Sequence, residues 1–66
     1  MILTINGERR EFDDGVTLAD LVAATLPTDR GVAVAVDGEV APRGTWSGLA
    51  LRDGQAIELL TAVQGG

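Results

Sequence analysis

The residues of this sequence that are most clearly suited to a chemical reaction are the two glycines at its end. Gly65 and Gly66 follow an apolar stretch that finishes at Val63. A diglycine has no side chains, so it can enter a narrow enzyme channel, and its backbone reaches angles that other residues avoid. An α-carboxyl has a pKa of about 3.3–3.7, so we expect the Gly66 carboxylate to be ionised at neutral pH. Such an anion can attack the α-phosphate of ATP, and the acyl-adenylate that results can accept sulfur or an amine.

The catalytic groups for such a reaction are absent from this chain. It has no Cys, His, Tyr or Lys, which excludes the usual thiolate, imidazole and Schiff-base chemistry. Ser47 and the threonines have no base to activate them as nucleophiles. A phosphate-binding loop of the G-x-x-x-x-G-K type is also missing from the sequence. We therefore expect no catalytic residue, bound cofactor or metal in this chain, and we expect a partner enzyme to bind the ATP.

Charge and hydropathy exclude several other classes of protein. The net charge of −5 disfavours nucleic acids and anionic membranes as partners. Asp13 and Asp14 are adjacent, whereas a calcium loop needs alternating acids, so they suit a turn before a helix. No apolar run reaches the length of a membrane span or a signal-peptide core. A cytoplasmic monomer is the expected form.

Turn signals and hydrophobic periodicity locate the elements that must position the end of the chain. Asn6-Gly7 and Asp37-Gly38 are each typical of a two-residue hairpin turn. Thr17 and Asp20 have the spacing of a capping box at a helix N-terminus. Four apolar residues after this cap share one helical face: Leu18, Leu21, Val22 and Leu26. The predicted elements are strands at 1–5, 8–12, 32–36, 39–41 and 56–63, a helix at 18–26, and irregular chain at 43–49 with a single helical turn before Trp46.

This order of elements predicts an α+β fold, with one amphipathic helix packed across a mixed sheet of about five strands. The helix connects two hairpins, which implies a parallel pairing, and the first and last strands are the expected pair. The order is the signature of the β-grasp, or ubiquitin-like, fold. We expect residues 1–63 to form a single domain and residues 64–66 a flexible C-terminal tail.

Several larger side chains have both a structural and a functional interpretation. Trp46 is expected to cover the core, because a Trp buries a large apolar area. Arg43 is expected to pair with an acid or a backbone carbonyl, and contact with a partner protein is the alternative for it. The three leucines Leu49, Leu51 and Leu60 either leave an apolar patch near the tail or are buried in the small core.

With these features the chain resembles the sulfur carrier proteins of thiamine biosynthesis over essentially its whole length. The resemblance depends most on the Pro-Arg-x-x-Trp segment at 42–46 combined with the Val-Gln-Gly-Gly ending at 63–66. It extends to Asn6-Gly7, to the strand at 32–37 with its following Gly38, and to the stretch 51–59. Either of the first two motifs alone would be weak, and their combination is fairly specific.

The resemblance implies a cycle of reactions at the end of the chain. An adenylating enzyme would activate the Gly66 carboxylate with ATP, and a sulfur donor, fed by a cysteine desulfurase, would convert it to a thiocarboxylate. Thiazole synthase would then accept the sulfur. Gly65, Gln64 and Val63 would form the segment that enters the active sites of the partners. Arg43 and Trp46 match the family pattern, and no catalytic role is assigned to either.

Other classes of protein share the fold and the diglycine ending. The small subunit of molybdopterin synthase is typically longer and often has proline close to its tail, whereas no Pro follows Pro42 here. A carrier for another sulfur pathway is a further alternative, because the partner sets the pathway. A ubiquitin-like modifier joined to lysines of other proteins and a plain interaction domain with an inert tail are also open at this point.

Overall fold

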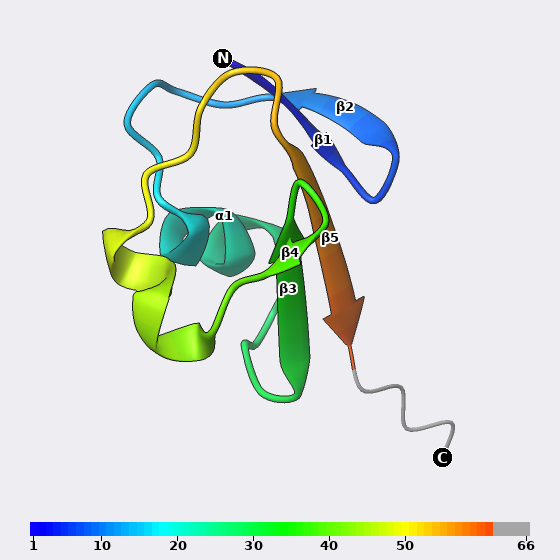
Figure 1. The fold of residues 1–66 in the computed structure, drawn as a ribbon, viewed down its shortest axis with the longest axis vertical. Coiled ribbons are helices and arrows are strands. Elements are labelled where there is room, and N and C mark those ends of the chain that lie inside the picture. Colours follow the sequence, from blue (N-terminus) through cyan, green and yellow to red (C-terminus); the bar gives the residue numbers. More distant parts are fainter. Residues whose placement is uncertain (62–66) are drawn as a thin grey trace.

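Two hairpins and one connecting helix build the fold of this protein (Figure 1). The computed structural model describes residues 1–61. The elements are β1 (Ile2–Ile5), β2 (Glu8–Glu11), α1 (Leu18–Thr25), β3 (Val32–Val36), β4 (Glu39–Val40), the 3₁₀ helix η1 (Arg43–Gly48) and β5 (Ala56–Thr61). Helix α1 packs on one side of the sheet with η1 beside it. The predicted α+β architecture is therefore confirmed.

The strands form a five-stranded sheet in the order β2-β1-β5-β3-β4. β1 and β5 are parallel, with Thr4 opposite Ala56 and Ile5 opposite Ile57, which confirms the expected pairing of the first and last strands. β5 is antiparallel to β3 from the pair Val36 and Ile57 to the pair Val32 and Thr61. The last strand is therefore the central one, and it has a neighbour on each side.

Both hairpin turns have the backbone angles that the sequence predicts. Asn6 and Gly7 have φ of 50° and 85°, and Asp37 and Gly38 have φ of 51° and 85°. Two successive positive φ angles define a type I′ turn, which favours Asn or Asp followed by Gly. The two turns fix the registers of β1 with β2 and of β3 with β4.

The core lies between the sheet and α1. Alternate residues of the strands face it, and Leu3 and Ile57 are completely buried. The buried apolar residues are Leu3, Ile5, Leu18, Leu21, Val22, Val32, Val34, Ala41, Trp46, Leu51, Ile57 and Leu59. Three of the four apolar positions predicted on the helix are among them. The valines of β3 face this core and its alanines face away, as the alternation in the sequence predicts.

Some predicted boundaries are wrong by one residue or more. α1 ends at Thr25, because Leu26 is an extended C-cap with φ −120° and ψ 148°. Pro27 follows Leu26, and a proline disfavours helical angles in the residue before it. β1, β2 and β4 are also each shorter than predicted, and η1 is a 3₁₀ helix of 6 residues where a single turn was expected. The predicted extension of the last strand to Val63 lies outside the described residues.

Two further expectations concern surfaces of the described chain. β2 is an edge strand whose four residues are all exposed, as its polar sequence predicts, and charged side chains there discourage pairing with another strand. Among residues 1–61, no helix is long and apolar enough to span a bilayer.

The capping box of α1 allows a test of how much its hydrogen bonds contribute to the stability of the protein. Asp20 N–H donates to Thr17 Oγ1 and Thr17 N–H donates to Asp20 Oδ2, both at 3.1 Å. Thr17→Ala is expected to lower the free energy of unfolding by about 1 kcal/mol, because it leaves a helix N–H without its partner. Urea denaturation followed by circular dichroism measures this loss. Thr17→Ser is the control and should stay close to the unmodified chain; equal stability of the Ala variant would contradict the prediction.

Candidate functional site

The site that the sequence predicts follows directly after the central strand. Val63, Gln64, Gly65 and Gly66 lie outside the described residues, so their predicted roles stay predictions. The structure describes β5 as far as Thr61. In Figure 1 β5 runs through the fold and ends on the side away from the N-terminus. β5 lies between β1 and β3, but its pairing with β1 stops at Ile57, so the end of β5 is paired only with β3.

Backbone pairing and one side chain hold the end of β5. Thr61 lies opposite Val32, the first residue of β3. On the other edge, the Asn6 side chain bonds both backbone groups of Leu59: Leu59 N–H donates to Oδ1 at 2.8 Å, and Nδ2 donates to the Leu59 carbonyl at 3.2 Å. A hollow of about 370 Å³ lies beside this end, between the β1–β2 hairpin and the last turn of α1. Leu26 and Thr61 are among its lining residues.

Among residues 1–61, the exposed large apolar side chains lie on the sheet face away from α1. Leu60 is 64% exposed and lies opposite Ala33, and Val40 is 74% exposed and lies opposite Ala35. Leu51 is buried and Leu49 is partly buried against the core, so the three leucines considered together in the sequence do not form one patch. Sequence reasoning missed Val40. The two-residue turn at Asp37-Gly38 could have placed it, because that turn aligns Val40 with an outward-facing alanine.

Arg43 and Trp46 join η1 to the loop before β3. Trp46 is 4% exposed and its Nε1–H donates to the Ala41 carbonyl at 2.8 Å, so the expected core role is confirmed. The Arg43 guanidinium lies 4.8 Å from the centre of the Trp46 ring and 2.9 Å from Asp29 Oδ2. It also donates to the Asp29 carbonyl, as the expected pairing with an acid or a carbonyl requires. Both residues thus have structural partners within the chain.

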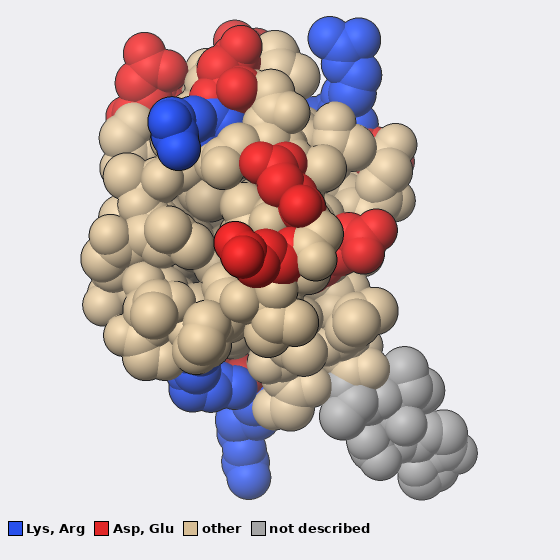
Figure 2. Space-filling view, in the orientation of Figure 1, with Lys and Arg blue, Asp and Glu red and all other residues tan. Residues whose placement is uncertain are grey.

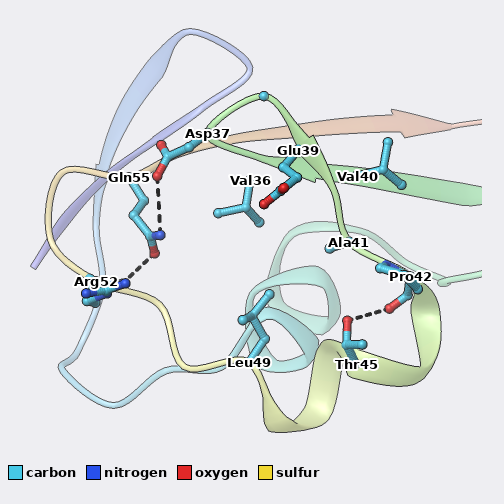
Figure 3. A pocket seen from close by; sticks show the side chains of 11 residues that line it. Val36, Asp37, Glu39, Val40, Ala41, Pro42, Thr45, Leu49, Arg52 and Gln55 are labelled. Carbon is cyan, nitrogen blue, oxygen red and sulfur yellow. Dashed lines mark hydrogen bonds between the residues drawn. The ribbon is translucent and has the colours of Figure 1, made fainter.

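A larger groove of about 780 Å³ lies between the β3–β4 hairpin, η1 and the loop before β5 (Figure 3). Asp37 and Glu39 are the acids among its lining residues, and both carboxylate oxygens of Asp37 accept hydrogen bonds. Oδ1 accepts from Ala56 N–H at 2.9 Å, and Oδ2 accepts from Gln55 Nε2 at 3.3 Å. Gln55 in turn accepts from the backbone N–H of Arg52 at 2.7 Å. The groove therefore presents a hydrogen-bonded support at the start of β5, at the other end of the strand from Thr61.

Charge is distributed unevenly over the molecule. Figure 2 shows acidic side chains over the front and the upper part of the fold, and basic side chains at both the upper and the lower end. The hollow beside the end of β5 has one acid and one base among its lining residues, Glu8 and Arg10. The described lining of this hollow is therefore balanced in charge, whereas the whole sequence has a net charge of −5.

Comparison with solved structures defines the class of this domain. The crystal structure of the thiamine biosynthesis protein (ThiS) from Geobacter metallireducens matches with a TM-score of 0.84 and 30% identity, over 100% of both chains. A solution NMR structure of a thiamine biosynthesis protein from the same organism gives a TM-score of 0.82 and 30% identity, over 100% of this chain and 88% of that one. The fold is therefore a β-grasp, as the order of elements predicted.

The chain belongs to the ThiS family, whose sequence model matches residues 3–66. The family resemblance expected from the motifs is confirmed by this match and by the structural similarity. A curated relative, the thiazole synthase of Paramagnetospirillum magneticum, is 33% identical over 66 residues. The present chain spans only 20% of the length of that protein.

Proposed function

We propose that this chain carries sulfur for thiamine biosynthesis as a thiocarboxylate on Gly66. The observation that carries the proposal is the family match through residue 66, because the matched region includes the diglycine whose carboxylate the chemistry requires. Structural similarity over the whole length of a ThiS protein supports it. The ThiS match also favours this role over that of the molybdopterin synthase subunit.

The proposed chemistry activates and then replaces one oxygen of the carboxylate. An oxygen of Gly66 attacks the α-phosphorus of ATP, and pyrophosphate leaves. Sulfur at the oxidation level of sulfide then attacks the acyl carbon, and AMP leaves with the original oxygen. Adenylation is needed because a carboxylate resists nucleophiles and has no good leaving group. The chain acts as carrier and co-substrate in this cycle, since it has no Cys, His or Lys with which to catalyse either step.

Partner enzymes supply everything else in the proposal. An adenylating enzyme binds the ATP. A cysteine desulfurase supplies sulfur as a persulfide, which a thiol reduces to the sulfide level while a disulfide forms. Thiazole synthase then accepts the sulfur. Support for the last partner comes from the relative named thiazole synthase, which contains a segment similar to this chain. Gly65, Gln64 and Val63 are proposed as the segment that enters the active sites. We propose the cytoplasm as the compartment.

Intact-mass spectrometry tests the proposed function. The 66-residue chain is incubated with the adenylating enzyme of its host, ATP and a sulfide source. The expected result is a mass increase equal to the replacement of one oxygen by sulfur, located by fragmentation at Gly66. Omission of ATP is the control and should prevent the change. A chain that stays unmodified with a demonstrably active adenylating enzyme would contradict the carrier function and favour a modifier or an interaction domain.

A further inference from the structure

The first residue of each hairpin turn holds the central strand β5, one near each end of the strand. At the start of β5, Asp37 N–H donates to the Ala56 carbonyl at 2.7 Å, and Asp37 Oδ1 accepts from Ala56 N–H at 2.9 Å. Toward the end, Asn6 N–H donates to the Ile57 carbonyl at 2.9 Å. The Asn6 side chain then bonds both the N–H and the carbonyl of Leu59. The two turns therefore act as a pair of clamps on one strand.

The Asn6 clamp extends the sheet beyond the point at which β1 ends. The parallel pairing of β1 with β5 stops at Ile5 and Ile57, and the chain turns away at Asn6. No backbone of β1 is left to pair with Leu59. A side-chain amide carries one carbonyl and one NH₂ group, so it can replace both groups of a peptide on a neighbouring strand. A carboxylate at this position would supply only acceptors, and an alkyl side chain would supply neither.

The position of this clamp relates it to the proposed site. Leu59 is the third residue from the end of the described chain, and Thr61 is the last. Without the Asn6 side chain, Leu59 has a paired neighbour only on the β3 edge, opposite Val34. Strand ends that are paired on one edge open more readily than strand ends paired on both. The clamp thus fixes the backbone direction at the point where the strand leads toward the diglycine.

We propose that Asn6 is a positioning residue for the reaction at Gly66, and this inference rests on the proposed function. By bonding both backbone groups of Leu59, it holds the described end of β5 in the sheet, so that the strand leading toward Gly66 is already ordered when the adenylating enzyme binds. A segment that starts from an ordered strand loses less conformational freedom when it enters an active site. Without the Asn6 side chain, the end of β5 has to become ordered when the enzyme binds, so binding loses more conformational entropy.

The two clamps provide a matched pair of variants. Asn6→Gly and Asp37→Gly each remove a side chain that bonds β5, at positions with nearly equal φ of 50° and 51°. Glycine adopts a positive φ without strain, so both turns should persist. The first variant frees the end of β5 near the site, and the second frees its start. Urea denaturation of both variants checks that their losses of stability are similar.

The readout is ATP–pyrophosphate exchange by the host's adenylating enzyme, with the 66-residue chain varied in concentration. Asn6→Gly is expected to lower kcat/KM about tenfold, mainly by raising KM. This factor corresponds to the conformational entropy of fixing the backbone of about one residue. Asp37→Gly is expected to stay within about twofold of the unmodified chain, because its clamp lies remote from the site. If the Asn6 side chain affected stability alone, both variants would lower kcat/KM by the same factor.

A third variant keeps the inference testable if Asn6→Gly fails to fold. Asn6→Asp retains an acceptor for Leu59 N–H, loses the donor to the Leu59 carbonyl, and should fall between the other two in kcat/KM. Equal kcat/KM for the Asn6 variants and Asp37→Gly would overturn the role of Asn6 and leave the carrier function standing. If the unmodified chain supports no exchange with an active enzyme, the carrier function and the role of Asn6 are both overturned.

Discussion

A chain that lacks Gly66 is expected to acquire sulfur at least about 100-fold more slowly than the full chain. Truncation moves the carboxylate back by one residue, and one extended residue spans about 3.3–3.6 Å. A misplacement of about 1 Å can already cost about 100-fold in rate, because reaction requires close alignment of the reacting atoms. The measurement is the ATP-dependent gain of sulfur by intact mass, with the adenylating enzyme and sulfide in excess.

Controls for this prediction separate chain length from folding. A chain with one extra glycine after Gly66 has the same terminal chemistry and should also react slowly if the reach of the carboxylate matters. The urea midpoint of the truncated chain should be unchanged, because the buried core of the described residues runs from Leu3 to Leu59. Sulfur transfer to the truncated chain at the full rate would contradict the assignment of Gly66 as the reacting residue.

Most parts of this fold that could be predicted have local causes. A type I′ turn requires two positive φ angles, so the residue pairs Asn6-Gly7 and Asp37-Gly38 are enough to predict the geometry of the two turns. The alternation of valine and alanine in β3 likewise identifies the buried face. Even the end of α1 at Thr25 has a local cause in Pro27, and the prediction ran one residue too far only because Leu26 continues the apolar face.

The order of elements predicted one pairing between distant segments, that of β1 with β5, but the side-chain contacts between distant segments could not be read from the sequence. Asn6 and Leu59 are 53 residues apart, and the first residue of a predicted turn gives no sign that its side chain continues a ladder on another strand. The stacking of Arg43 on Trp46 and its pairing with Asp29 depend on how η1 packs against the loop before β3. For the candidate site the sequence supplied the chemistry of the diglycine, and the parallel pairing of β1 and β5 shows that a central strand leads to it.

Ile57→Ala is expected to unfold much of the protein at physiological temperature. Ile57 is completely buried in the central strand, between Ile5 on β1 and Val36 on β3. Truncation of a buried Ile to Ala costs about 2–5 kcal/mol, from lost transfer energy and from the cavity that remains. A single core in a domain of this size supplies only about 3–5 kcal/mol of stability. The measurement is urea denaturation, with Trp46 fluorescence as the probe.

Leu60→Ala is the matched control, because it makes a comparable truncation three residues further along the same strand. Leu60 is 64% exposed, so its loss should change the free energy of unfolding by only about 0.5 kcal/mol. Similar losses for the two variants would contradict the assignment of Ile57 to the core and of Leu60 to the outer face. Sulfur transfer is measured for both variants. Loss of transfer in Ile57→Ala is then explained by unfolding, whereas Leu60→Ala remains folded and reports on the exposed face of β5. Any loss of transfer in the folded Leu60→Ala protein would then assign that face to partner binding, since neither the core nor the diglycine has been altered.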